Sequence, residues 1–448
     1  MKYDVVISRY GFVTVDAKSA VEAIDAANRL NEEDISWSDS WDATEAMESD
    51  ECNFSEDDTE ILKLSEDGKT LLACNKNATG EITIPEGVTT IGKSAFFCCE
   101  NITDITIPQS VTTIEEEAFA NCSSLTSIIL PEGVTAIEAG TFYLCVELAS
   151  ITIPKDVKTI GECAFTGCYS LTNITIPEGV TAIGNAAFEK CQNLVQMAIP
   201  EGVTTIGNSL FCNCKNITSI TLPKGLTTIG HEAFRECWSL ESIDIPESVT
   251  DIENGAFRNC GLTSISLPEG ITAIKDCTFL NCNSLRTIVI PQKVTAIEMY
   301  AFSGCSCLSS ITIPEGVTDI GNSAFAKCCN LINIAIPKSV KMIGNHAFSG
   351  CKSLAAIIIP EGVTAIEDST FAECESLTNI GIPKRVTTIG KFAFVDCRSL
   401  TDVKIPESVT AIGDFAFMRC KSLSNITIPQ KAIAIGDRIF YGCLELKK

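Results

Sequence analysis

The chain has 448 residues, of which 33 are basic and 57 acidic, and its formal net charge is −24 at pH 7. A balance this negative argues against nucleic acid and anionic membranes as partners. Single globular cores stop growing at roughly 250 to 300 residues, so a chain of this length either divides into domains or forms an elongated repeat array. The acidic residues are concentrated in residues 1–60, and the rest of the chain is closer to neutral.

Residues 1–47 predict a small ββαβ domain. Apolar residues alternate with polar ones over residues 3–8 and 12–16, which predicts two strands, and a third strand is expected within residues 35–46. Ser19-Ala-Val-Glu22 is a capping box, which predicts an amphipathic helix from there to about Leu30. This stretch resembles the small DpnD/PcfM-like domains of mobile-element proteins, and the resemblance implies recruitment or an accessory role without chemistry.

Two short segments follow this domain. Residues 48–60 are an acidic run, which predicts a solvated linker. Residues 61–80 predict two strands around Glu66-Asp67-Gly68-Lys69, because Asp-Gly is a strong hairpin signal. A hairpin at this place would cap the first coil of a repeat array, which otherwise exposes apolar surface and a sheet edge.

Residues 81–448 predict sixteen copies of a 23-residue repeat. All 16 prolines fall in one register from Pro85 to Pro429, and a phenylalanine and a cysteine follow each proline in the same register. A period of this length predicts a solenoid in which each copy is one coil stacked on the last. The single 22-residue step, from Pro246 to Pro268, predicts one tighter turn that leaves the strands in register.

The segment from Leu171 to Cys191 represents the repeat. Ile174 and Ile176 alternate with polar residues, which predicts a half-buried strand that ends at Pro177 because proline cannot donate to a ladder. A second short extended piece, residues 180–183, then leads into a compact turn that buries Phe188. A coil of this kind can bury its apolar face only against the next coil.

The repeat pattern Leu-x-x-Ile-x-Ile-Pro-x-x-Val-x-x-Ile-Gly-x-x-Ala-Phe-x-x-Cys resembles the BspA-like leucine-rich repeat family over about four fifths of the chain. The resemblance implies a curved, right-handed solenoid of mainly β structure with a parallel sheet along one face. It also implies a protein-binding role, because exported family members are surface proteins that bind host or bacterial partners.

Cysteine is unusually frequent, with 24 in the chain, and sixteen of them occupy one position of the repeat. An inward thiol in every coil behaves as a small buried hydrophobe. Side chains stacked in register point the same way and cannot easily reach the torsion that a disulfide needs. The pattern therefore predicts reduced, structural thiols and a reducing compartment.

The sequence predicts no enzyme, cofactor or metal site. The only histidines, His231 and His346, lie in exposed turns five coils apart, so they cannot share a site with one another. Adjacent cysteines such as Cys98-Cys99 and Cys328-Cys329 each include one repeat cysteine, and none has the spacing of a zinc site. The acidic segments lack the oxygen spacing and central glycine of a calcium loop.

Two surfaces of the predicted solenoid are candidates for protein binding. The residue two before each proline should point away from the core, and most of these residues are small and uncharged, which also describes ordinary β-surface. The departures from this pattern are Ile129, Asp244, Val289, Ile358 and Lys404. The turn after each phenylalanine is a rival surface because it carries large residues that we expect to be exposed, among them Tyr143, Trp238 and Met418.

These features favour a non-enzymatic scaffold that binds a protein or peptide. Two alternatives stay open, namely a surface adhesin of BspA-like type whose export signal is missing from this sequence and a structural solenoid that self-associates. Only residues 5–8 separate Asp4 from Arg9, which is too short for the apolar core of a signal peptide, and no apolar run could insert in a membrane. The sequence as it stands predicts a cytoplasmic protein, with a cell-surface or secreted location as the alternative.

Overall fold

The computed structural model describes residues 2–7, 11–16, 43–48 and 60–446. In the first three segments, strands β1 (Lys2–Ile7), β2 (Gly11–Asp16) and β3 (Ala43–Glu48) form an antiparallel sheet in the order β2-β1-β3. The helix predicted between residues 19 and 30 and most of the predicted linker at residues 48–60 lie outside the described residues.

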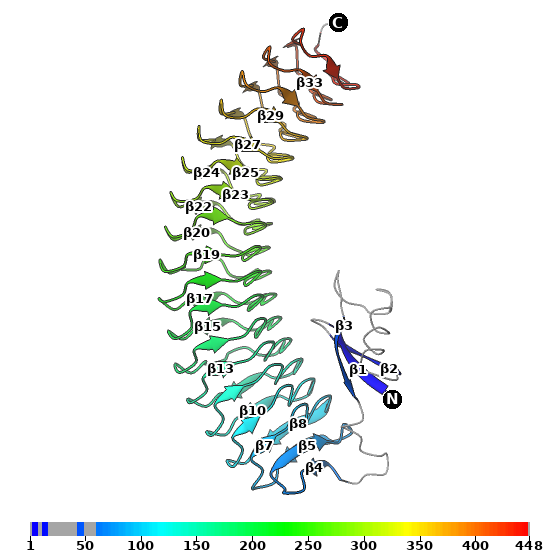
Figure 1. The fold of residues 1–448 in the computed structure, drawn as a ribbon, viewed down its shortest axis with the longest axis vertical. Coiled ribbons are helices and arrows are strands. Elements are labelled where there is room, and N and C mark those ends of the chain that lie inside the picture. Colours follow the sequence, from blue (N-terminus) through cyan, green and yellow to red (C-terminus); the bar gives the residue numbers. More distant parts are fainter. Residues whose placement is uncertain (1, 8–10, 17–42, 49–59, 447–448) are drawn as a thin grey trace.

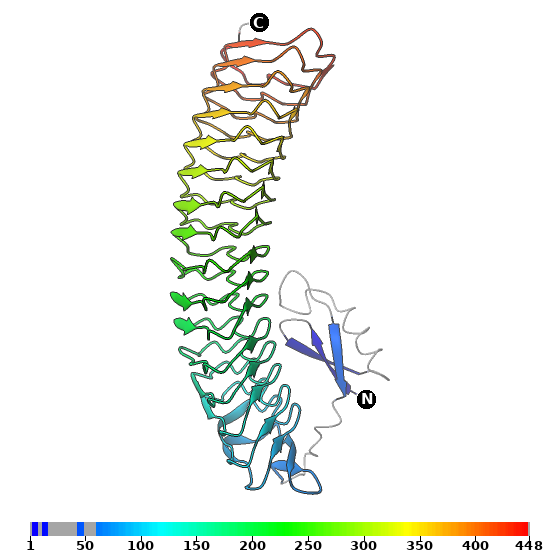
Figure 2. The same ribbon diagram turned by 60° about the vertical axis from the view of Figure 1, so that its left-hand side comes forward.

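Residues 60–446 form one curved column of stacked coils (Figures 1 and 2). Parallel strands follow the column along two sides, in sheets of two to six strands, and the described part of the chain contains no helix. The predicted mainly-β solenoid is therefore confirmed. None of the described residues form a helix long and apolar enough to cross a bilayer.

The strands that precede the prolines follow the first of these sides and are together named here the long-strand sheet. Each strand ends before its proline, as a residue without an N–H requires. The strands are β6 (Thr79–Thr83), β8 (Asn101–Thr106), β10 (Ser127–Ile129), β12 (Ser150–Thr152), β15 (Gln196–Ala198), β17 (Ser219–Thr221), β20 (Ser264–Ser266), β22 (Thr287–Val289), β24 (Ser310–Thr312), β26 (Asn333–Ala335), β28 (Ala356–Ile358), β30 (Asn379–Gly381), β32 (Asp402–Lys404) and β34 (Asn425–Thr427).

The second side, named here the short-strand sheet, consists of two-residue strands after each proline turn. They are β7 (Thr90–Ile91), β9 (Thr113–Ile114), β11 (Ala136–Ile137), β13 (Thr159–Ile160), β14 (Ala182–Ile183), β16 (Thr205–Ile206), β18 (Thr228–Ile229), β19 (Asp251–Ile252), β21 (Ala273–Ile274), β23 (Ala296–Ile297), β25 (Asp319–Ile320), β27 (Met342–Ile343), β29 (Ala365–Ile366), β31 (Thr388–Ile389), β33 (Ala411–Ile412) and β35 (Ala434–Ile435). The isoleucine of nearly every pair points into the core.

Two coils depart from the predicted strand pattern. Residues 172–175 and 241–244 belong to no strand, although the sequence predicts one in each coil. In the first of these coils Ile174 is still buried, and the N–H of Val195 in the next coil donates to the carbonyl of Thr172 at 3.2 Å. The core position of Ile174 and a backbone contact to the next coil are thus kept although these residues belong to no strand.

Because the coils stack in register, each side chain lies next to the side chain at the same repeat position of the neighbouring coil. Strand pairs such as β10 and β12 join residues 23 positions apart, for example Ser127 with Ser150. The phenylalanines consequently form one continuous stack with ring centroids 5.1 to 5.9 Å apart. Offset aromatic pairs of this kind contribute about 0.5–1.5 kcal/mol each beyond the area that they bury.

The first coil is covered by an antiparallel hairpin of β4 (Leu62–Leu64) and β5 (Thr70–Cys74), and β5 continues the short-strand sheet by pairing with β7. The turn is closed by Asp67, whose carboxylate accepts bonds from the Ser65 hydroxyl at 2.6 Å and the Lys69 N–H at 3.0 Å. Gly68 adopts a φ of +70°, a conformation that favours glycine. The hairpin supplies the pairing partner that the first coil would otherwise lack.

The turn around each phenylalanine forms a third line of hydrogen bonds between coils. The residues two before and two after every repeat phenylalanine have positive φ, which lies between 50° and 62° where the residue is not glycine. This alternation points every second N–H group at the following coil, so that Phe142 donates to the carbonyl of Ala164 at 2.8 Å and Leu144 to that of Thr166 at 2.8 Å. The stack imposes a conformation that single residues adopt rarely.

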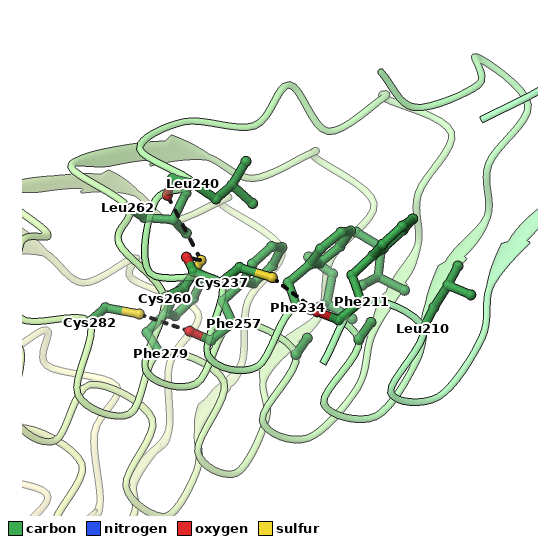
Figure 3. Close-up of a cluster of buried hydrophobic side chains, with 14 of the residues drawn as sticks. Leu210, Phe211, Phe234, Cys237, Leu240, Phe257, Cys260, Leu262, Phe279 and Cys282 are labelled. Atoms are coloured by element: carbon green, nitrogen blue, oxygen red, sulfur yellow. Dashed lines mark hydrogen bonds between the residues drawn. The ribbon is translucent and has the colours of Figure 1, made fainter. Parts of the chain in front are cut away.

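The repeat cysteines point inward and donate hydrogen bonds to the preceding coil. The thiol of Cys237 donates to the carbonyl of Phe211 at 3.2 Å and that of Cys282 to the carbonyl of Phe257 at 3.0 Å (Figure 3). The same contact recurs along the column, from Cys122 to Cys443. All described cysteines have free thiols. A small apolar side chain with one donor suits a position beside a carbonyl in the core.

The 22-residue step changes this pattern at one coil. The Cys260 thiol donates to the carbonyl of Cys237 at 3.3 Å rather than to a phenylalanine carbonyl. A β-carbon on Gly261 would lie 1.9 Å from the carbonyl oxygen of Trp238, so only glycine fits there. The N–H of Thr263 still donates to the carbonyl of Glu241 at 2.9 Å, the same contact that other coils make at a separation of 23 residues. The missing residue is absorbed in the turn.

Candidate protein-binding surface

The outward side of the long-strand sheet is defined by three positions in each coil, namely the first, second and fourth residues after the repeat leucine. In the coil of Leu285 these are Arg286, Thr287 and Val289, and all three are exposed while the intervening Ile288 is buried. The same alternation holds in neighbouring coils because side chains of a strand point to opposite faces in turn. This set of positions is named here the outer face.

The five predicted residues of this face are all exposed. Ile129, Val289 and Ile358 expose 68%, 64% and 81% of their surface, and Asp244 and Lys404 are also solvent-accessible. The five residues do not form one cluster, because successive members lie two to five coils apart along the column. Val289 and Ile358 share a run of coils whose outer face carries no charge between them.

The rival turn surface is less exposed than predicted. Trp238 is exposed over 55% of its surface, and the ammonium of Lys215 lies 4.9 Å from the centre of its ring. Tyr143 and Met418, by contrast, are half-buried, so the expectation of exposure was wrong for both. The position after each phenylalanine lies under the same position of the neighbouring coils, and desolvation there raises the pKa of Tyr143.

The prediction from the position two before each proline missed outer-face residues that directly follow a repeat leucine, among them Val195, which is 43% exposed. Ile332 is 50% exposed and lies directly after Leu331, and Arg286 lies at the equivalent place after Leu285. These residues could have been found from the sequence, because most residues directly after a repeat leucine are threonine, serine or alanine and a valine, isoleucine or arginine there departs from the pattern.

Charge is distributed unevenly along the outer face. Its residues from Thr126 to Thr221 are uncharged, and from Arg286 to Gly381 the only charged residue is Arg286 itself. Glu241 and Asp244 separate the two stretches. The second stretch also carries the exposed side chains of Val289, Ile332 and Ile358, and it is named here the apolar stretch. Exposed aliphatic side chains on a surface with few charges are typical of protein interfaces.

Two hollows lie along this side of the column. One, of about 400 Å³, is lined mainly by uncharged side chains of the first stretch, including Asn173, Thr175, Gln196, Ser219 and Thr221. The other, of about 410 Å³, borders the apolar stretch and is lined by Arg286, Cys307, Ser309, Asn330, Ile332 and Ser353.

Several charged groups elsewhere in the described residues pair with one another. Glu232 is buried and accepts from Arg235 at 3.0 Å, with Arg258 at 3.5 Å on its other oxygen. Asp396, also buried, pairs with Arg419 of the next coil. The pairs of Arg258 with Glu232 and of Arg419 with Asp396 join adjacent coils. No group of three metal-ligating side chains occurs among the described residues.

Comparison with protein families decides the identity of the repeat. A family profile described as "BspA type Leucine rich repeat region (6 copies)" matches residues 73–171, 135–260, 227–355 and 341–448. The chain belongs to the BspA-type leucine-rich repeat family. This family consists of repeat proteins that are generally non-enzymatic and that mediate protein interactions. Comparison with curated proteins found no match.

Solved structures of bacterial repeat proteins are similar to this BspA-type chain. A leucine-rich repeat protein from Bacteroides ovatus is 30% identical, with a TM-score of 0.53 over 88% of this chain and 94% of that one. A leucine rich cell surface protein from Faecalibacterium prausnitzii is 31% identical, with a TM-score of 0.48 over 82% of this chain and 92% of that one.

Proposed function

We propose that this BspA-type chain is a non-enzymatic scaffold and that the apolar stretch of its outer face binds a segment of another protein. The observation that supports the proposal is the combination of exposed Val289, Ile332 and Ile358 with a run of coils whose outer face carries a single charge. Family membership adds support, since leucine-rich repeat proteins generally mediate protein interactions.

The energetics favour a partner that covers these side chains. Full burial of one aliphatic side chain contributes about 1.5–3 kcal/mol, so three exposed ones supply a substantial part of a micromolar affinity. Five coils at about 4.8 Å each give a stretch roughly 24 Å long, which suits an extended segment or the edge of a small domain. The flat, rigid surface requires little ordering when it binds.

Capture experiments with the full chain test this proposal. The triple variant Val289→Thr, Ile332→Thr and Ile358→Thr keeps β-forming residues while it removes the apolar side chains, and we expect it to lose bound partners that the wild type retains. Met342→Thr is the matched control, because Met342 is 51% exposed but lies on the short-strand sheet. Identical capture by the wild type and the triple variant would remove the apolar stretch from consideration.

Light scattering over a concentration series distinguishes a foreign partner from a second copy. A mass that doubles with concentration in the wild type but not in the triple variant would show that the apolar stretch pairs with itself. A constant monomer mass, together with loss of capture in the triple variant, supports a different protein as the partner.

A further inference from the structure

The residues that line the hollow beside the apolar stretch occupy equivalent positions of successive coils. Each of its lining residues comes immediately before or immediately after a repeat leucine, so it follows the line where the turn meets the long-strand sheet. Arg286, Ser309 and Ile332 follow their leucines, and Cys307, Asn330 and Ser353 precede theirs. Its volume of about 410 Å³ is sufficient for one or two side chains of a partner.

Arg286 is the one charged residue among those that line this hollow. Its guanidinium makes no ion pair or side-chain hydrogen bond with any described residue, although its backbone N–H donates to Thr263 at 2.9 Å. Arg235, Arg258 and Arg398 show the contrast, since each pairs with a carboxylate. An arginine presents five donors in a planar fork that matches a carboxylate.

The other lining residues give the hollow a polar side and an apolar side. The amide of Asn330 and the hydroxyls of Ser309 and Ser353 can donate further hydrogen bonds, while Ile332 supplies an apolar side. The hollow thus combines one unpaired cation and neutral donors with an aliphatic surface that continues to Val289 and Ile358. No acidic residue lines it.

Resting on the proposed function, we propose that the hollow receives the carboxylate of an aspartate or glutamate side chain in an extended segment of the partner. Aliphatic side chains of the same segment lie on Ile332 and its apolar neighbours. Residues two apart in an extended segment point the same way about 6.6 Å apart, so an acidic residue with aliphatic residues two positions before and after it matches this surface. The guanidinium of Arg286 selects a partner segment that carries a carboxylate, and the apolar contacts supply most of the buried interface area.

Cys307 gives a direct readout of the charge inside the hollow. Its thiolate attacks the sulfenyl sulfur of a methanethiosulfonate, the disulfide forms, and methanesulfinate leaves. We expect the anionic 2-sulfonatoethyl reagent to label Cys307 faster, relative to the cationic 2-(trimethylammonio)ethyl reagent, in the wild type than in Arg286→Gln. The ratio of the two rates should fall at least about fivefold in the variant at low salt.

Peptide mapping by mass spectrometry resolves the labelled cysteine, and half-buried Cys277, which does not line the hollow, is the internal control. Its rate ratio should be the same in both proteins. A rate ratio at Cys307 that does not respond to Arg286→Gln would overturn the inference.

Binding of two matched peptides tests the occupant itself. The probes are fluorescent, acetylated and amidated Ile-Ser-Glu-Ser-Ile and its Ile-Ser-Gln-Ser-Ile twin, in which the central residue and both isoleucines point to the same face, measured with the full chain. A charge-assisted pair predicts at least about tenfold tighter binding of the glutamate peptide, and Arg286→Gln should abolish the difference. Equal affinities, or binding of neither peptide, contradict the proposal. Tighter binding of a Gln peptide with a free C-terminal carboxylate would show that a chain end is the ligand and would also overturn it.

The two proposals fail in distinguishable ways. If the triple variant loses its partner while Arg286→Gln keeps both full partner affinity and the wild-type labelling ratio, only the carboxylate site is wrong. If the triple variant keeps its partner, the proposed function itself is wrong.

Discussion

Alkaline pH should destabilise this solenoid strongly, because its buried thiols hold their protons. Burial raises the pKa of Cys145, Cys212 and Cys260 from the ordinary 9.0 to about 12. The folded chain therefore keeps protons that the unfolded chain releases above pH 9. The stability that these thiols contribute is fully present below that pH and is lost as the pH rises from 9 to about 12.

The magnitude follows from this difference in pKa. One pH unit above the unfolded pKa, each such thiol lowers the free energy of unfolding by about 1.4 kcal/mol. The three thiols with a pKa of about 12 together remove about 4 kcal/mol at pH 10. The other buried repeat cysteines, such as Cys351 and Cys374, also have raised pKa values and act in the same direction. Typical folding free energies are about 5–15 kcal/mol, so most of the stability should be gone near pH 10.

Urea denaturation followed by far-UV circular dichroism, between pH 8 and 10.5 in the presence of a reductant, measures this loss. A variant with Cys145, Cys212 and Cys260 all replaced by alanine is the control, and its loss between pH 8 and 10 should be smaller by about 4 kcal/mol. A urea midpoint independent of pH over this range would refute the reasoning.

Two further substitutions test the stacking itself. Phe257→Ala should cost about 3–5 kcal/mol, because Phe257 is fully buried between neighbouring rings at 5.4 and 5.6 Å, whereas half-buried Phe440 stacks on one ring alone and its replacement should cost clearly less. Comparable melting shifts for the two variants would contradict a stack in which each ring depends on both neighbours. Gly261→Ala should cost about 1–3 kcal/mol because its β-carbon meets the Trp238 carbonyl, while Gly381→Ala, with no atom within 4 Å, should be neutral or slightly stabilising. Thermal unfolding distinguishes these outcomes, and an equal loss at both glycines would show that the close approach at Gly261 is relieved by a shift of the chain.

The candidate surface was only partly predictable from the sequence. Alternation along the strand correctly placed Val289 and Ile358 outside, because a period of two is enforced by backbone geometry. The exposure of Tyr143 and Met418 was not predictable in the same way, since residues in the turn are covered by side chains from adjacent coils. The hollow at Arg286 required the structure, because its lining residues come from successive coils and meet only after stacking.

The sequence by itself determined the repeat, the coil and the core. Proline, phenylalanine and cysteine recur at one period, and side chains at one position must stack when identical coils pair in register, so the aromatic column follows directly from the spacing. Only the tertiary structure decided the turn around each phenylalanine. Its left-handed residues are mostly not glycine, and an isolated residue such as Phe392 or Tyr300 would avoid that conformation. The hydrogen bonds to the following coil make it favourable, and those bonds exist only in the assembled column.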